Sequence, residues 1–185
     1  MSKSSLYIKK LVLIALLGAS LNAFKFVLMY IPNIEVVTLL IVTYTYVFGL
    51  GTGFFATMLF CTLEGFLWGF NPTWLSAYYI HWGLLSLVTY LLKLLKIKNA
   101  IIVAFVTALV TALFGLQSTF MYYLFGGGIG KSGWIDRYMA TYISGALFYI
   151  TQTVSNFVIL LLAFKPICYF LEKMKSKYYY GEVRV

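Results

Sequence analysis

Acidic and amide side chains inside apolar stretches are the residues of this sequence best suited to bind a polar molecule. Glu64 lies within one apolar run and Gln117 within another, and the last run contains Gln152 and Asn156. Polar groups inside a membrane are costly and usually face a cavity or one another. The sequence contains no nucleophile motif and no metal-ligand pair. It therefore indicates a binding site rather than an enzyme, and we expect no catalytic residue, metal or cofactor.

Aromatic residues are grouped near the predicted depth of these polar side chains. Trp74, Tyr78 and Trp82 are four residues apart, so a helix places them on one face. The single histidine, His81, adjoins that face. Aromatic side chains suit a ligand with flat or apolar rings. Individually the tryptophans and tyrosines also fit the interfacial belt of a membrane protein, and His81 equally fits a packing role.

The predicted ligand site collects polar and aromatic residues from the outer halves of several helices and from outer loops. It consists of Asn33, Glu35, Glu64, Trp68, Trp74, Tyr78, His81, Trp82, Gln117, Tyr122, Trp134, Arg137, Tyr149, Gln152 and Asn156. Acids and bases nearly balance at this level, so the sequence does not favour an anionic ligand. Glu35 is equally compatible with a simple helix-start acid.

The composition shows what kind of scaffold must position these residues. Of 185 residues, 62% are hydrophobic and 10% are charged, with a mean hydropathy of +0.91. A soluble domain has about 25% charged residues, so this is an integral membrane protein. Because a span needs about 20 apolar residues, we predict one all-α domain, residues 1–185, with six transmembrane helices at about 8–31, 33–48, 53–69, 74–95, 99–125 and 135–171.

Short turns are expected on both sides of the second helix. Pro32 suits the first turn of a helix, and Glu35 would then lie near the positive end of the helix dipole. Gly49, Gly51 and Gly53 predict a tight turn into the third helix.

The distribution of basic residues predicts the orientation in the membrane. Eleven of the 14 Lys and Arg residues fall on the side of the two termini, and only Lys25, Lys131 and Arg137 fall on the other. The positive-inside rule then places both termini in the cytoplasm of a multi-pass cell-membrane protein. This asymmetry explains the net charge of +9 as orientation and lipid contact, so we expect no nucleic-acid binding.

A stripe of small residues marks the first helix. Ala15, Ala19 and Ala23 recur every four residues and share one helix face. Small residues allow another helix to approach closely inside lipid. We expect a partner subunit on this face, and packing within the same chain is the alternative.

The segment GGGIGKS resembles a phosphate-binding P-loop, G-x-x-x-x-G-K-[ST]. With Gly130, Lys131 and Ser132 as its end, the first glycine would be residue 125, which is Phe125. The segment also follows a predicted membrane helix rather than a strand. Nucleotide binding is therefore not expected, and we interpret the segment as a flexible outer loop.

Taken together, these features resemble the S components of energy-coupling factor (ECF) vitamin transporters, which are their substrate-binding membrane subunits. The resemblance covers essentially the whole chain. It rests on six predicted helices with both ends inside, a mass of 21.0 kDa, the alanine stripe, and the Pro-Asn-Ile-Glu turn at residues 32–35.

The resemblance implies a fold, partners and a mechanism. The alanine stripe would contact the transmembrane coupling subunit, and two cytoplasmic ATPases would supply energy. The loop between the first two helices would be a gate over a vitamin held by helices four to six. The subunit would topple in the bilayer to deliver its ligand. Among vitamins with ring systems, the resemblance slightly favours a corrinoid over a flavin, thiamine or a pyridoxine.

Two other classes remain open from sequence alone. An intramembrane enzyme could use Glu64 or His81. A structural or assembly protein would have no ligand, although it would not need so many polar residues at one depth.

Overall fold

The computed structural model describes residues 3–32 and 34–179, and the regular secondary structure of this part of the chain is all α-helix. Five helices are long and apolar enough to cross a membrane, namely α1, α3, α4, α5 and α7. This is consistent with a multi-pass membrane protein. The elements are α1 (Lys3–Leu28), α2 (Val37–Phe48), α3 (Leu50–Trp68), α4 (Pro72–Leu94), α5 (Ala100–Phe125), α6 (Trp134–Ser144) and α7 (Ala146–Tyr179).

Helix α2 begins four residues later than the predicted second helix at 33–48 and ends at the same residue. Its 12 residues extend about 18 Å at 1.5 Å per residue, which is well short of a hydrocarbon core of about 30 Å. Every residue of α2 except Phe48 is buried, and the helix packs against α1, α3, α4 and α7. A helix that is apolar all round belongs in a core, so α2 is the centre of the bundle.

The connection between α1 and α2 is longer than the very short turn that the sequence predicts. Helix α1 ends at Leu28 and α2 begins at Val37, so Pro32 lies in the connection and not in a first helical turn. Glu35 precedes the N-cap residue Val36. The Glu35 carboxylate accepts a hydrogen bond from α7, and this long-range contact holds the residues before α2 outside the helix.

The glycine-rich turn after α2 also differs from the prediction. Only Gly49 separates α2 from α3, with a φ of +90°, a value that glycine adopts readily. Gly51 and Gly53 lie inside α3. A Cβ at Gly53 would overlap the backbone and side chain of Thr45, so this glycine lets α2 and α3 pack backbone to backbone.

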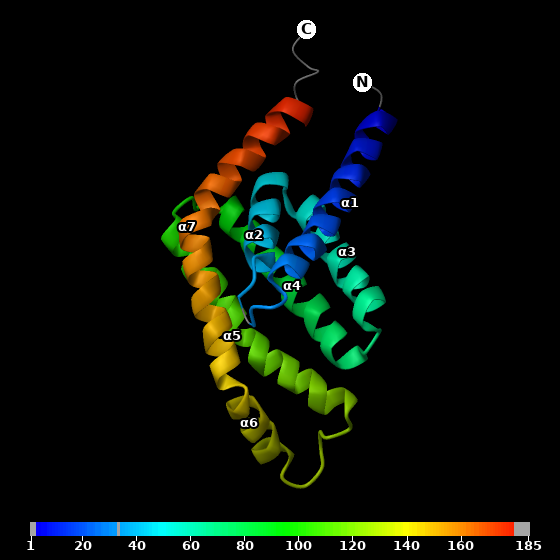
Figure 1. Cartoon of the computed structure of the whole chain (residues 1–185), viewed down its shortest axis with the longest axis vertical. Helices are drawn as coiled ribbons and strands as arrows, with labels where there is room; N and C mark the ends of the chain where they lie inside the picture. The colour runs from blue at the N-terminus through cyan, green and yellow to red at the C-terminus, as the bar shows by residue number, and fades with distance from the viewer. Residues whose placement is uncertain (1–2, 33, 180–185) are drawn as a thin grey trace.

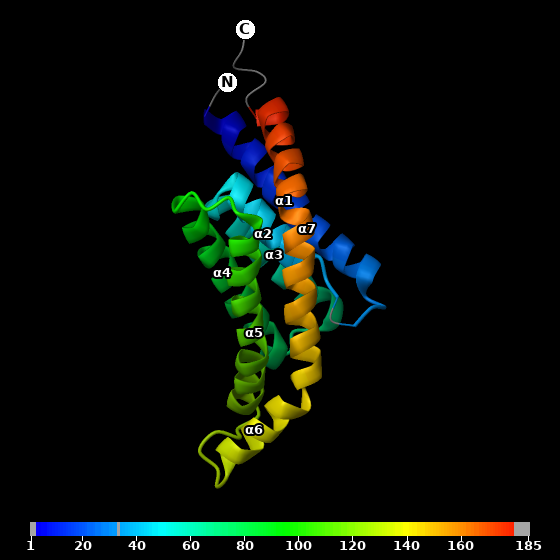
Figure 2. The same cartoon turned by 90° about the vertical axis from the view of Figure 1, so that its left-hand side faces the viewer.

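The predicted helix at 135–171 is in fact two helices that meet at Gly145 (Figure 2). The ring of Tyr149 fills the space beside Gly145, and a Cβ there would lie 2.8 Å from it. The Tyr149 ring is also stacked on Tyr142 at 5.5 Å. Helix α6 therefore turns away from the axis of α7, and α7 continues beyond the predicted end to Tyr179.

The long helices form a bundle around α2. Helix α5 packs against both α4 and α7, and α1 packs against α3. The start of α1 and the end of α7 lie at the same end of the molecule (Figure 1). Helix α6 and the glycine-rich loop before it form the opposite end.

Candidate functional site

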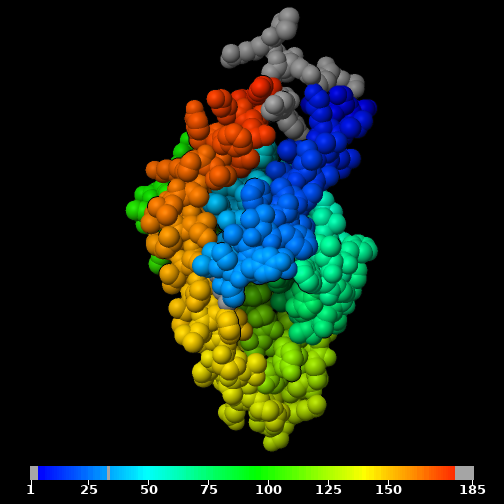
Figure 3. Space-filling model, viewed as in Figure 1, coloured from blue at the N-terminus to red at the C-terminus, as the bar shows by residue number. Residues whose placement is uncertain are grey.

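A cavity of about 240 Å³ lies in the middle of the molecule, under the connection between α1 and α2. In Figure 3 this connection crosses the visible face between α7 and α3, with α5 recessed beneath it. The wall combines charged, amide, aromatic and aliphatic side chains. Its lining residues are Lys25, Leu28, Met29, Ile31, Pro32, Ile34, Glu35, Tyr78, Phe114 and Gln152.

Glu35 forms the acidic side of this cavity. Its Oε1 accepts hydrogen bonds from the Thr38 hydroxyl and from the Gln152 amide, each at 3.0 Å. The amide of Asn156 lies 3.5 Å from the same oxygen. Gln152 and Asn156 are four residues apart on α7, so they present adjacent donors on one face of that helix. The structure therefore brings together three of the residues that the sequence assigned to the site.

The same network joins three elements of the bundle. Asn156 donates to the hydroxyl of Thr38 at 3.1 Å and lies 3.5 Å from that of Thr111 on α5. All three side chains are buried. Since buried polar groups contribute most when they are hydrogen-bonded, Asn156 of α7 links α2 to α5 and helps to hold Glu35 at the cavity.

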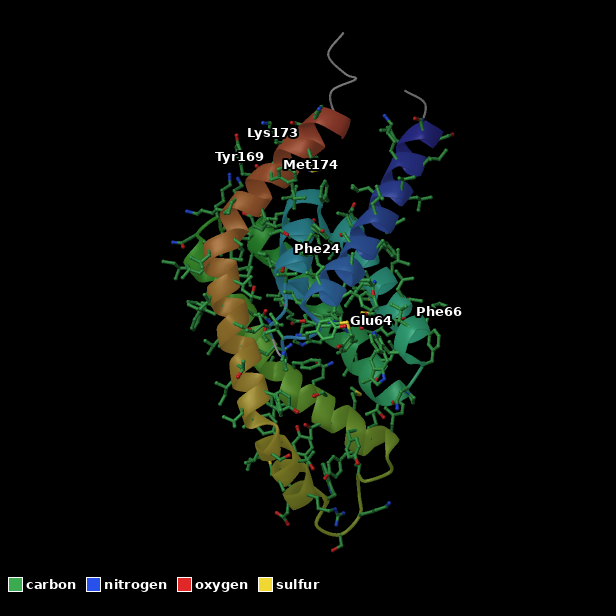
Figure 4. The ribbon with its side chains drawn as sticks, viewed as in Figure 1. Phe24, Glu64, Phe66, Tyr169, Lys173 and Met174 are labelled. Atoms are coloured by element: carbon green, nitrogen blue, oxygen red, sulfur yellow. The ribbon has the colours of Figure 1, made fainter. Side chains whose placement is uncertain are left out.

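Lys25 and Glu64 form an ion pair on the other side of the cavity. Glu64 lies in the interior, where α3 faces α1 (Figure 4). The Lys25 ammonium also lies 3.5 Å from the Tyr78 hydroxyl and 5.1 Å from the centre of its ring. A buried carboxylate is tolerated when it is paired in this way. The sequence places Lys25 among the charges of the outer cavity but not among the predicted ligand-binding residues; its signal is an isolated cation near the end of an apolar helix, complementary to Glu64.

The predicted aromatic face of α4 is present and extends toward α5. Tyr78 contacts Trp74 at 5.3 Å and Trp82 at 6.1 Å between ring centres. Phe114 of α5 stacks on Trp82 at 6.3 Å and contacts Tyr78 at 6.1 Å. Tyr78 and Phe114 line the cavity, whereas Trp82 is buried behind them. Phe114 was not predicted, because a phenylalanine in an apolar helix carries no distinguishing signal.

His81 and Gln117 lie in the packed interior rather than in the cavity wall. The His81 ring is fully buried and contacts Trp82 at 4.7 Å and Phe114 at 4.9 Å. The Gln117 amide donates to the backbone carbonyl of Ala77 at 3.3 Å. His81 therefore packs against the rings of Trp82 and Phe114, and Gln117 joins α5 to α4 next to them.

Trp68 and Glu64 border a much smaller cavity of about 20 Å³. A space of this size holds no more than a single water molecule. Trp68 itself is exposed and contacts Phe26 at 6.1 Å. These two residues lie next to the central cavity without lining it.

The remaining predicted site residues lie away from the centre. Tyr122 and Arg137 line a separate cavity near the glycine-rich loop. Tyr149 lines a third, between α5 and α7, and Trp134 begins α6. Asn33 lies outside the described residues. One predicted site is therefore divided among several places, because depth along a helix does not specify the direction of a side chain.

The alanine stripe faces away from the bundle. Ala15, Ala19 and Ala23 are all exposed, while Gly18 and Leu21 of the same helix are buried. A Cβ at Gly18 would lie 3.1 Å from the Ala56 carbonyl oxygen of α3. Helix α1 thus contacts α3 through the face that carries Gly18. The alternative that the alanine stripe packs against another helix of this chain is wrong for the described residues.

Chemically, the central cavity presents one carboxylate, one ammonium, one amide and two aromatic rings. It can hold a small polar ring compound by hydrogen bonds and by contact with the ring faces. Among the described residues, no group of three or more His, Cys, Asp or Glu side chains is placed to hold a metal ion. No protein family, curated protein or solved structure matches the chain.

Proposed function

We propose that the protein is the substrate-binding S component of an ECF-type importer and that it captures a small vitamin from outside the cell. The observation that carries this proposal is the central cavity, where Lys25, Glu35 and Gln152 meet two aromatic rings. Polar side chains converge there from α1, the following connection and α7, in helices that are otherwise strongly apolar. Such convergence is costly in lipid and is expected where a ligand binds.

The size of the cavity supports a small ligand. Pockets for drug-sized ligands have volumes of about 300–1,000 Å³, and this one has about 240 Å³. A corrinoid macrocycle is far larger than this volume. A single-ring or two-ring vitamin, such as thiamine or a pyridoxine, matches it better.

The charges of the cavity support a ligand that carries hydrogen-bond donors or a positive charge. Lys25 is already paired with Glu64, whereas the partners of Glu35 are neutral side chains. Glu35 is therefore the charge that remains uncompensated. Tyr78 and Phe114 supply the faces for an aromatic ring, which also favours a cationic ring.

The exposed alanine stripe supports a partner subunit in the membrane. Ala15, Ala19 and Ala23 allow a neighbouring helix to approach the α1 backbone, and no helix in the described part of the chain covers them. In this proposal the transmembrane coupling subunit packs there, two cytoplasmic ATPases drive the cycle, and both termini of the S component are cytoplasmic.

Mass spectrometry of the detergent-purified protein tests this function. We expect a small vitamin to copurify with the wild-type chain and to be depleted in Glu35→Gln. Asp136→Asn, on exposed α6, is the matched control and should retain the compound. An empty wild-type protein that also fails to bind any added vitamin would contradict the proposal and favour an assembly role. Chemical conversion of the bound compound would favour an enzyme.

A further inference from the structure

A second cavity lies at the far end of the molecule, where α5 ends and α6 begins. Its volume is about 400 Å³, and it shares no residue with the central cavity. Cationic, hydroxyl, aromatic and glycine residues line it: Tyr122, Tyr123, Gly126, Gly128, Lys131, Ser132 and Arg137.

The charge of this cavity is positive. Lys131 and Arg137 both line it, and no acidic side chain does. The nearest acid in sequence, Asp136, lies at the start of α6 but does not line the cavity. A Cβ at Gly133 would lie 3.9 Å from the Asp136 carboxylate and 4.0 Å from the Arg137 guanidinium. In the part of the chain that the structure describes, neither Lys131 nor Arg137 forms an ion pair.

The walls of the cavity are held by specific contacts. The Gly128 amide donates to the Tyr123 carbonyl at 2.8 Å, and the Tyr123 hydroxyl hydrogen-bonds to Thr141 of α6 at 3.0 Å. A Cβ at Gly128 would lie 2.5 Å from the Tyr123 ring, so the glycine allows the loop to close against α5. The loop is therefore held against α5 and α6, and its Lys131 lines the same cavity as Arg137 of α6.

We propose that this cavity binds a phosphate group, with Lys131, Arg137 and Ser132 as its ligands. Guanidinium and ammonium groups form strong charge-assisted hydrogen bonds with phosphate oxygens, and the Ser132 hydroxyl adds a neutral donor. The volume exceeds that of phosphate alone, so the organic part of the ligand lies along Tyr122 and Tyr123. This site is independent of vitamin binding in the central cavity.

The phosphate can belong to a soluble phosphate compound or to the headgroup of an anionic lipid. Both sources offer the same oxygens to the same cations. The cavity differs from a nucleotide P-loop, because Phe125 stands where that motif needs its first glycine and no strand precedes the loop.

The first measurement titrates inorganic phosphate into the full-length protein in neutral detergent, by calorimetry or phosphorus NMR. The test variant is Lys131→Gln combined with Arg137→Gln, and the control is Lys96→Gln combined with Lys98→Gln. All four residues are exposed, so both variants should keep the wild-type unfolding temperature. Loss of two charge-assisted hydrogen bonds should weaken phosphate binding at least tenfold in the test variant only.

The second measurement distinguishes the lipid source. The same proteins are placed in nanodiscs of equal parts phosphatidylglycerol and phosphatidylcholine, and retained lipids are counted by native mass spectrometry. Selective loss of phosphatidylglycerol from the test variant supports a lipid headgroup, whereas loss confined to the phosphate titration supports a soluble ligand. The proposal is overturned if the wild type binds neither, or if test and control variants bind both equally. Binding of vitamin at the central cavity plays no part in either readout.

Discussion

Lys25 of α1 and Glu64 of α3 form an ion pair between residues that are 39 positions apart in the chain. The two partners differ in their access to solvent, since Glu64 is 1% exposed and Lys25 is 28% exposed. Lys25 also interacts with Tyr78 of α4. Lys25 thus links α1 to α3 and α4, and it lines one side of the central cavity.

This asymmetry predicts unequal effects of breaking the pair. Lys25→Met leaves the buried Glu64 charge without a partner and should lower the free energy of unfolding by about 3 kcal/mol. Glu64→Leu should cost less, because the partly exposed Lys25 can turn toward the surface. The double variant should recover part of the loss of Lys25→Met. Unfolding in detergent, followed by tryptophan fluorescence, provides the comparison, with exposed Lys131→Met as control. Equal losses in both single variants would contradict the predicted asymmetry, and additive losses in the double variant would contradict the pairing.

Glu35 is expected to determine the affinity of the central cavity. A hydrogen bond to a charged group contributes about 1.5–3 kcal/mol, so Glu35→Gln should weaken binding of the proposed vitamin ligand by about ten- to a hundredfold. Asp136→Asn removes an acid from the distant α6 and should leave the affinity unchanged. Calorimetric titration measures both. Wild-type affinity in Glu35→Gln would show that the ligand lies elsewhere.

The exposed alanine stripe should matter for transport and not for folding. Replacing Ala15 and Ala19 with tryptophan would hold a partner helix away from α1, so uptake should be abolished while vitamin binding in detergent persists. Phe24→Trp, on the opposite side of α1 and also exposed, should transport normally. Uptake is measured in cells that also express the coupling subunit and ATPases. Normal uptake by the double variant would remove the stripe from the partner interface.

Two glycines of α3 should respond in opposite ways to alanine. At Gly53 the new Cβ would overlap Thr45, and overpacking of this kind costs about 1–3 kcal/mol. At exposed Gly51 the nearest atom is the Lys10 ammonium at 3.5 Å, so the higher helix propensity of alanine should be neutral or stabilising by up to about 1 kcal/mol. Unfolding temperatures of the two variants are the measurement. A Gly53→Ala protein as stable as Gly51→Ala would mean that α2 and α3 are not in close contact.

Cysteine labelling should reveal the orientation in the membrane. The native cysteines, Cys61 and Cys168, are buried and should react slowly with an impermeant maleimide. Lys131→Cys should be labelled in intact cells, whereas Lys96→Cys should be labelled only after the membrane is opened. The reverse pattern would place the termini outside.

The sequence by itself determined the class of the protein and the position of most of its helices. Hydropathy is a local property, so long apolar runs identify membrane helices without knowledge of the fold, and the helix predicted at 99–125 is found at Ala100–Phe125. The spacing of Trp74, Tyr78 and Trp82 likewise placed three rings on one face, because helical geometry repeats every 3.6 residues.

Only the tertiary structure decided which side chains meet. Lys25 pairs with Glu64, and Gln152 reaches Glu35 across 117 positions, because neighbouring helices are rotated so that these side chains face each other. Glu35, which makes this contact, precedes the first residue of α2. The Tyr149 ring packs beside Gly145, where α6 ends and α7 begins. Depth along a helix can be counted from sequence, but the rotation of one helix against another depends on how all of them pack.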